Sequence, residues 1–277
     1  MELRILENLP HQADDFEGSS IEFLQFTSLV WGTPDNGQPL FRSGKIAIMT
    51  LDETMNQLKA LRHDGVYKQN AKNGAGDNQF GVKSADLKAV AKSIKSDTEL
   101  AQKLWKTGNL DAMMLATLIA KPKLMSKEEV EAMVRSATLW HAADYLNTNI
   151  VKMHPEKEEL RQKWMAANDP ATNRSAWSLT AERICKHPAG LDLHGLLDRI
   201  EKELGVNVQE NPKLTMEHSK WMLNYCLAEI GIRNPELRNR AMAIGEKMGA
   251  CRDYPTSKGC VSPYAPSWIA VMVRRQG

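Results

Sequence analysis

Apolar residues recur at helical spacing through almost every segment from Leu51 to the C-terminal end, and polar stretches separate these segments. Apolar positions three and four apart lie on one face of a helix, whereas strict alternation is typical of a strand. Hardly any alternating run of β-branched residues occurs in this part of the chain. The pattern therefore predicts an all-α fold.

Polar residues and prolines indicate where these helices begin and end. Ser126 precedes Glu129 by three residues at the start of an apolar pattern, which is the spacing of a capping box. Ser84, ahead of Leu87, is predicted to be another N-cap. Six prolines fall between the periodic segments, namely Pro122, Pro155, Pro170, Pro188, Pro212 and Pro235. Breaks roughly 15–35 residues apart predict about a dozen helices joined by short loops.

Segments of this size, recurring in pairs, favour antiparallel helical hairpins that stack on one another. In HEAT-type repeats each pair buries its apolar face only against its neighbours, and the stack forms a superhelix. A strict sequence repeat is not found, so a closed helical bundle is the alternative architecture.

Residues 1–48 differ from the rest of the chain. They are rich in acidic residues, and glycines and prolines interrupt their short apolar pieces. We expect an acidic, irregular or strand-containing N-terminal extension, followed by a helical-repeat domain over residues 49–277. A translation start placed upstream of the true one, near Met49, explains the same pattern equally well.

The composition is that of an ordinary globular protein. Of the 277 residues 42% are hydrophobic and 25% are charged, which excludes a disordered or low-complexity chain. The formal net charge of +2 conceals an asymmetry, because the acidic excess lies in residues 1–48 and the remainder is mildly basic. A basic body favours a phosphate-bearing partner.

The cysteines and the hydropathy pattern favour a cytoplasmic protein without a metal or cofactor. The four cysteines form no CxxC pair and have no histidine at zinc-finger spacing. No apolar run approaches the ~20 residues of a membrane-spanning helix. We therefore expect neither a disulfide framework, a metal site nor a membrane association.

Trp140 and Asp144 are the first candidates for chemistry. They are spaced i, i+4 and so share a helix face. A carboxylate beside an indole ring can stabilise a cation by Coulomb attraction and by the ring quadrupole. The alternative interpretation is a core tryptophan next to a solvated surface aspartate.

Two further segments carry aromatic residues near polar groups. Arg174 precedes Trp177 by one turn near a helix start and could bind a phosphate bidentately, although its stem could instead cover Trp177. Trp221 and Tyr225 share a face of an apolar helix that is predicted to end at Gly231 or a few residues beyond, and core packing is the default for both.

A cluster of lysines surrounds the glycine-containing stretch 74–82. That stretch is predicted to be a turn, because it lacks the Lys-Ser/Thr of a nucleotide-binding loop. The lysines could form a stripe that binds phosphates, or could simply be a solvated helix face. They are Lys68, Lys72, Lys83, Lys88, Lys92 and Lys95.

Taken together, these segments resemble a known family. Asn78-Gln79-Phe80-Gly81-Val82-Lys83, continuing to Lys88, is similar to the entry motif of the DNA alkylation repair enzymes, the AlkD-like glycosylases. Trp140-His141-Ala142-Ala143-Asp144 is similar to the W-x-x-x-D motif of that family. The resemblance extends from about Met49 to about Trp268.

The resemblance implies a superhelix of HEAT-like repeats that holds double-stranded DNA on a concave basic face. It also implies a base-excision glycosylase that hydrolyses the N-glycosidic bond of cationic alkylpurines such as N3-methyladenine and N7-methylguanine. Asp144 matches the catalytic carboxylate, Trp140 the aromatic residue before it, and Arg174 an arginine that contacts the DNA backbone. Tyr225 falls where the family has a second tryptophan of the cleft, when Asn234-Pro235 serves as the anchor. Ala228 occupies a position where active members carry another arginine.

The chemistry of such substrates agrees with these assignments. An alkylated purine is already cationic, so its departure needs no general acid, and the enzyme must stabilise the sugar as it becomes an oxocarbenium-like cation. We thus expect Asp144, Trp140 and Tyr225 to be catalytic. Arg174, Lys68, Lys72, Lys83 and Lys88 are expected to bind the DNA of a metal-free monomer that associates with the nucleoid. A non-enzymatic protein that binds unusual DNA structures, and a protein-binding scaffold, are the alternatives.

Overall fold

A computed structural model describes residues 49–137, 139–167, 169–205, 217–256 and 259–276, all within one compact unit, Met49–Gly277. Across these ranges the regular structure is helical, and the β pairing is limited to an isolated bridge between Arg62 and Val82. The predicted all-α class is confirmed. The predicted N-terminal extension, residues 1–48, lies outside the described residues.

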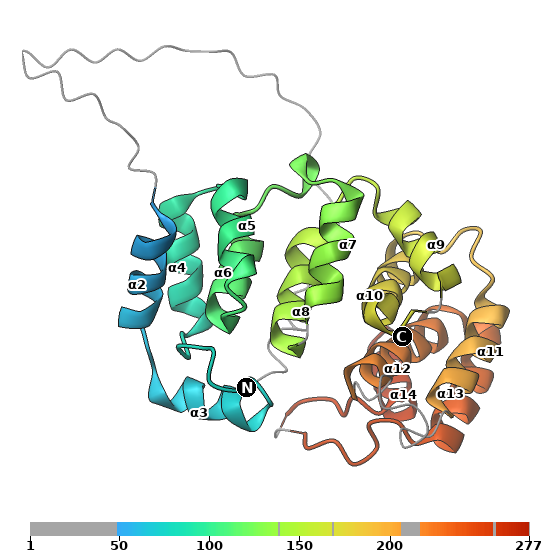
Figure 1. Ribbon diagram of the computed structural model, residues 1–277. Coiled ribbons are helices and arrows are strands. Elements are labelled where there is room, and N and C mark those ends of the chain that lie inside the picture. The colour runs from blue at the N-terminus through green and yellow to red at the C-terminus, as the bar shows by residue number, and fades with distance from the viewer. Residues whose placement is uncertain (1–48, 138, 168, 206–216, 257–258, 277) are drawn as a thin grey trace, which may run out of the picture. The chain divides into compact units, whose positions relative to one another are not determined.

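The helices follow one another along the chain, mostly with short connections; the connections from α3 to α4 and from α13 to α14 are longer (Figure 1). The first part of the domain contains α2 (Leu51–Ala60), α3 (Asp64–Lys72), α4 (Ser84–Ile94), α5 (Thr98–Lys106), α6 (Leu110–Ile119) and the 3-10 turn η1 (Pro122–Leu124). The middle contains α7 (Lys127–Ser136), α8 (Trp140–Leu146), the π-helical turn η2 (Asn147–Val151), α9 (Lys157–Ala167) and α10 (Pro170–Lys186). The last part contains α11 (Leu193–Leu204), α12 (Glu217–Arg233), α13 (Pro235–Met248) and α14 (Ala265–Gln276).

These helices form pairs, and the pairs stack. Within pairs, α5 packs on α6, α7 on α8, α9 on α10, α11 on α12 and α13 on α14. Between pairs, the second helices form a continuous layer, because α6 contacts α8, η2 contacts α10, and α12 contacts both α10 and α14. These second helices, α6, α8, α10, α12 and α14, are called the inner layer of the stack. Figure 1 shows this succession from blue to red. The predicted superhelical stack of HEAT-like antiparallel pairs is confirmed, and the closed bundle is not observed.

Two hydrophobic clusters meet at α10. Ala176 and Leu179 belong to the cluster that extends from Leu58 on α2, whereas Trp177 and Ile184 belong to the cluster that extends to Ile269 on α14. Every residue from Thr172 to Ala181 is buried, so α10 is the central helix of the stack. In a stack of this kind each helix pair contacts only its neighbouring pairs, and the stacked pairs together form an extended surface that can bind a ligand.

The predicted start of α7 is confirmed and that of α4 is wrong. Ser126 accepts a hydrogen bond from the Glu129 N–H at 3.1 Å, and its own N–H donates to the Glu129 carboxylate at 2.7 Å. At α4 the N-cap is Lys83, which makes no side-chain capping bond, and Ser84 is already helical.

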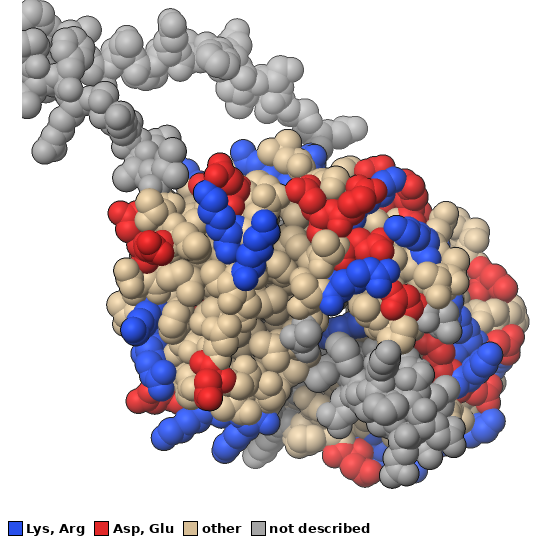
Figure 2. Space-filling view, in the orientation of Figure 1, with Lys and Arg blue, Asp and Glu red and all other residues tan. Residues whose placement is uncertain are grey.

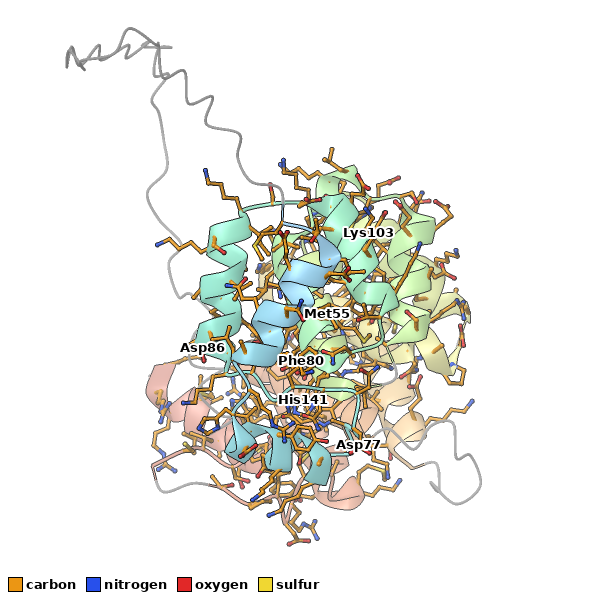
Figure 3. The ribbon with its side chains drawn as sticks, turned by 60° about the vertical axis from the view of Figure 1, so that its left-hand side comes forward. Met55, Asp77, Phe80, Asp86, Lys103 and His141 are labelled. Carbon is orange, nitrogen blue, oxygen red and sulfur yellow. The ribbon has the colours of Figure 1, made fainter. Side chains whose placement is uncertain are left out.

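The preceding loop sets the start of α4. The buried carboxylate of Asp111 on α6 accepts hydrogen bonds from the backbone N–H groups of Phe80, Gly81 and Val82 at 2.6, 3.0 and 2.8 Å. This loop, in which Phe80 is labelled in Figure 3, thus takes its position from α6 rather than from a serine cap. Gly81 has φ +76°, and a Cβ there would lie 2.5 Å from the Tyr67 backbone nitrogen, so only glycine fits.

Candidate active site

Asp144 and Arg174, predicted separately, form an ion pair. Nη2 of Arg174 on α10 donates to Oδ1 of Asp144 on α8. The arginine side chain is 6% exposed and the aspartate side chain 44% exposed. Asp144 therefore reaches the surface at the inner layer of the stack, while its counter-ion lies beneath the surface.

The local sequence explains this geometry. Asp169 caps α10 by accepting from the Ala171 N–H at 3.1 Å, and Pro170 occupies the first turn, where its missing N–H costs nothing. Arg174 therefore lies in the second turn, in the buried stretch of α10. Two of its nitrogens, Nε and Nη1, are buried and have no acceptor among the described residues.

Trp140 and His141 stand at the start of α8, one turn before Asp144. Their rings stack with centroids 3.5 Å apart and planes inclined by 27°. Burial lowers the pKa of His141 to about 4, although the nearby Asp144 carboxylate acts in the opposite direction. The imidazole is therefore neutral at pH 7 and adds no positive charge beside Asp144. Figure 3 labels His141 within this region.

Tyr225, the third predicted catalytic residue, lies on α12. Its ring packs against Trp268 on α14 with centroids 5.5 Å apart. Burial, with the Glu229 carboxylate nearby, raises the pKa of Tyr225, so its hydroxyl stays protonated. The hydroxyl can donate a hydrogen bond, and a catalytic role for Tyr225 stays a prediction.

The structure shows α10 and α12 to be largely core. Trp177 is fully buried, and its indole N–H donates to Glu203 at 2.9 Å. The Arg199 guanidinium lies over its ring, 5.4 Å from the centroid. Ala228 is fully buried as well. The helix containing Tyr225 ends at Arg233, two residues beyond Gly231, as the sequence predicts.

The predicted DNA-binding lysines are exposed on α3, on α4 or at its N-cap. Within the described ranges none of these four forms an ion pair; they are Lys68, Lys72, Lys83 and Lys88. By contrast, lysines of the central pairs are neutralised, as when Lys127 binds Glu156 and Glu159 at 3.1 and 2.7 Å. Figure 2 shows basic side chains at the edge formed by α3, with acidic side chains beside them, and mixed basic and acidic side chains over α7 and α9.

Sequence reasoning missed a lysine on which the charge of Asp144 acts. Lys152 follows the π-helical turn η2, and its N–H donates to the Asn147 carbonyl five residues earlier, at 3.0 Å. The charges that act on Lys152 include Glu182 on α10 and Asp144. No sequence signal marks it, because a π turn cannot be recognised from apolar periodicity.

Two further features bear on cofactors and membranes. Within the described ranges, no three His, Cys, Asp or Glu side chains converge in a way that could hold a metal ion. In the same part of the chain, no helix has the length and apolar character needed to cross a bilayer.

The fold and the site together define a helical-repeat protein with an ion-paired carboxylate on its inner layer. A model of the DNA alkylation repair enzyme family matches residues 54–269, so the chain belongs to that family. Among solved structures, a member of "a new family of proteins related to the HEAT-like repeat DNA glycosylases with affinity for branched DNA structures" is similar. It is 26% identical, the alignment covers 82% of this chain and 95% of that one, and the TM-score is 0.63. No curated protein matches the chain significantly.

Proposed function

We propose that this protein is a DNA glycosylase that releases cationic alkylpurines, N3-methyladenine and N7-methylguanine, from double-stranded DNA, with Asp144 as the catalytic carboxylate. The observation that carries the proposal is the Asp144–Arg174 pair, in which a buried guanidinium fixes a half-exposed carboxylate. A carboxylate that is oriented before the substrate binds stabilises a developing cation without a further cost of reorganisation.

The charges around Asp144 suit an oxocarbenium-like transition state. Arg174 occupies Oδ1, and no described residue donates a hydrogen bond to Oδ2, so that oxygen can face the sugar. The neutral His141 does not compete for it. The indole of Trp140, one helical turn before Asp144 on α8, offers a π system that is worth about 0.5–2 kcal/mol to a nearby cation.

The unpaired lysines of α3 and α4 support binding of the DNA backbone. A lysine that has no carboxylate partner can neutralise a phosphate and release a counterion without first losing an ion pair. The phosphate contact predicted for Arg174 stays a prediction, and it would require this guanidinium to leave its buried position beside Asp144. Action as a monomer, associated with the nucleoid, is part of this proposal.

A second candidate function is binding of unusual DNA structures without base excision. It is favoured by the affinity for branched DNA of the similar solved family and by the buried Ala228, at a position where the resemblance implies an arginine in active members. The positive charge of Arg174 beside Asp144 also reduces the field that the carboxylate can exert on a sugar cation.

One experiment separates the two functions. The protein is incubated with methylated duplex DNA, and released N7-methylguanine and N3-methyladenine are measured by chromatography; affinities for a four-way junction and for a linear duplex are measured in parallel. A glycosylase releases both bases in a time-dependent manner. Preferential binding of the junction with no base release would reject the glycosylase proposal in favour of the second candidate.

A further inference from the structure

Glu203 on α11 binds α10 at two positions that flank Arg174. Its Oε2 accepts hydrogen bonds from the side-chain N–H of Asn173 at 3.2 Å and from the indole N–H of Trp177 at 2.9 Å. Residues four apart lie on one face of a helix, so both donors project from the same side of α10. One oxygen that accepts from both donors fixes the rotation of α10 about its own axis.

The Glu203 carboxylate is itself held in place. Nε of Arg199, one turn earlier on α11, donates to Oε1 of Glu203 at 2.6 Å, and Nη1 of Arg199 donates to the Met165 carbonyl of α9 at 2.6 Å. The side chains of Arg199 and Glu203 are only 27% and 17% exposed, so water competes little for these bonds. One largely buried ion pair thereby joins α9, α10 and α11.

The rotation of α10 determines where Arg174 points. Arg174 follows Asn173 directly and projects about 100° further around the helix, where its Nη2 meets Asp144 on α8. A rotation of α10 by about 20° would move a side-chain end about 5 Å from the helix axis by about 2 Å, which is enough to break that hydrogen bond. Among the described residues no other acceptor holds the guanidinium, because its buried Nε and Nη1 have no partner there.

We propose that Glu203 is a positioning residue for the catalytic carboxylate. By fixing the rotation of α10 it keeps Arg174 against Oδ1 of Asp144, and Arg174 in turn fixes the direction of that carboxylate before DNA is bound. A carboxylate oriented in advance stabilises a developing cation without reorganisation. The inference rests on the proposed role of Asp144, but its first test does not require base excision.

The first test is a cycle of substitutions in the full chain, measured by urea unfolding at pH 7. Asp144→Ala, Glu203→Gln and the double variant are compared with the wild type. The effects of residues that act independently add, whereas the effects of residues in one network do not. We expect the factor by which Asp144→Ala raises the unfolding equilibrium constant to be at least tenfold smaller in the Glu203→Gln background, because an Arg174 that has already left Asp144 loses little when the carboxylate is removed.

The second test measures the release of N7-methylguanine in a single turnover, at a temperature at which the variant is folded. Glu203→Gln should lower the rate at least tenfold and change the affinity for duplex DNA less than threefold, because the bonds of Glu203 are made inside the protein. A merely structural role would reduce the stability and leave the rate of the folded protein unchanged.

Glu131→Gln is the matched control. The Glu131 side chain on α7 is 16% exposed, and it accepts from the Trp164 indole at 3.2 Å and from Arg135 at 2.9 Å. Its bonds within the described ranges go to α7 and α9, and none goes to α10. This variant should be less stable than the wild type, yet the effect of Asp144→Ala in its background and its rate of base release should be those of the wild type.

Asn173→Ala removes only the 3.2 Å bond and takes the place of Glu203→Gln in both tests should that variant not fold. Effects of Asp144→Ala and Glu203→Gln that simply add, or base release by the folded variant at the wild-type rate, would overturn the inference. A wild type that releases no base rejects the glycosylase proposal, and the unfolding cycle alone then decides on Glu203.

Discussion

Nη2 of Arg174 on α10 holds Oδ1 of Asp144 on α8, thirty residues earlier in the chain, and the two side chains differ in burial. The arginine is almost fully enclosed, whereas nearly half of the aspartate side chain is accessible. A buried charge depends on its partner much more than an exposed one does. Removal of Asp144, which leaves the buried arginine without a counter-ion, should therefore destabilise the protein more than removal of Arg174.

This asymmetry predicts unequal effects of the two deletions on stability. Asp144→Ala leaves a buried guanidinium without a counter-ion and should lower the free energy of unfolding by about 2–4 kcal/mol. Arg174→Met leaves a carboxylate that water can solvate and should cost less than about 1 kcal/mol. Urea unfolding at pH 7 measures both, and the double variant should resemble Arg174→Met. Equal losses from the two single substitutions would contradict the asymmetry.

The close packing at Gly81 predicts that Gly81→Ala destabilises the protein more than Gly74→Ala does. In Gly81→Ala the new Cβ would lie 2.5 Å from the Tyr67 nitrogen, in addition to the unfavourable positive φ. Gly74 also has a positive φ, +86°, but a Cβ there meets nothing within 4 Å. Gly74→Ala should therefore cost only the backbone strain, about 1–2 kcal/mol, and Gly81→Ala at least about 2 kcal/mol more. Thermal unfolding of the two variants compares these costs; similar midpoints would exclude a clash at Gly81.

The lowered pKa of His141 predicts that this residue contributes to the loss of folding stability at acid pH. Its pKa is about 4 in the folded protein against 6.5 for a free histidine, and burial is the cause. Between these pH values the unfolded chain binds a proton that the folded chain does not, so stability falls as the pH decreases from about 6.5 to about 4.

His141→Phe keeps a ring for the stack on Trp140 and removes the titration. Because His141 is only partly buried, solvent screening limits its contribution to about 1–2 kcal/mol. The loss of stability between pH 7 and pH 4.5 should be smaller in the variant by this amount, measured by urea unfolding at each pH. An unchanged loss would exclude His141 as a source of acid sensitivity.

The exposed lysines of α3 and α4 predict a salt-dependent contribution to DNA binding. Each of Lys68→Ala, Lys72→Ala, Lys83→Ala and Lys88→Ala should weaken duplex binding and reduce the slope of log K against log salt by about 1. Lys103→Ala is the control, because Lys103 is already paired with Glu99 at 2.7 Å. A titration from low to moderate salt gives these slopes, and slopes equal to that of the wild type in all four variants would remove this surface from the interface.

Periodicity and capping residues were sufficient to predict the fold class. Apolar spacing identified the helices, and Ser126 with Glu129 marked the start of α7 correctly. The start of α4 was predicted one residue too late, at Ser84, because the carboxylate of Asp111 fixes the preceding loop. Such a contact joins residues about thirty positions apart, and local sequence rules carry no information on it.

The candidate site was only partly accessible to sequence reasoning. The i, i+4 spacing of Trp140 and Asp144 and their resemblance to the family motif identified the carboxylate, but its pairing with Arg174 depends on how α10 packs. Lys152 was not predicted, because the π turn changes the helical phase before it, and the sequence Asn147–Val151 contains no signal for a π turn.

The central claim is tested most directly by the rate at which Asp144→Asn releases N7-methylguanine from methylated duplex DNA in a single turnover. Asparagine keeps an oxygen for Arg174 but carries no charge, so we expect at least a ~100-fold lower rate, measured at a temperature at which the variant is folded. The thermal midpoint should fall, because the buried Arg174 loses its counter-ion, whereas the affinity for abasic-analogue DNA should stay close to that of the wild type. Release at the wild-type rate by a folded Asp144→Asn variant would contradict the account.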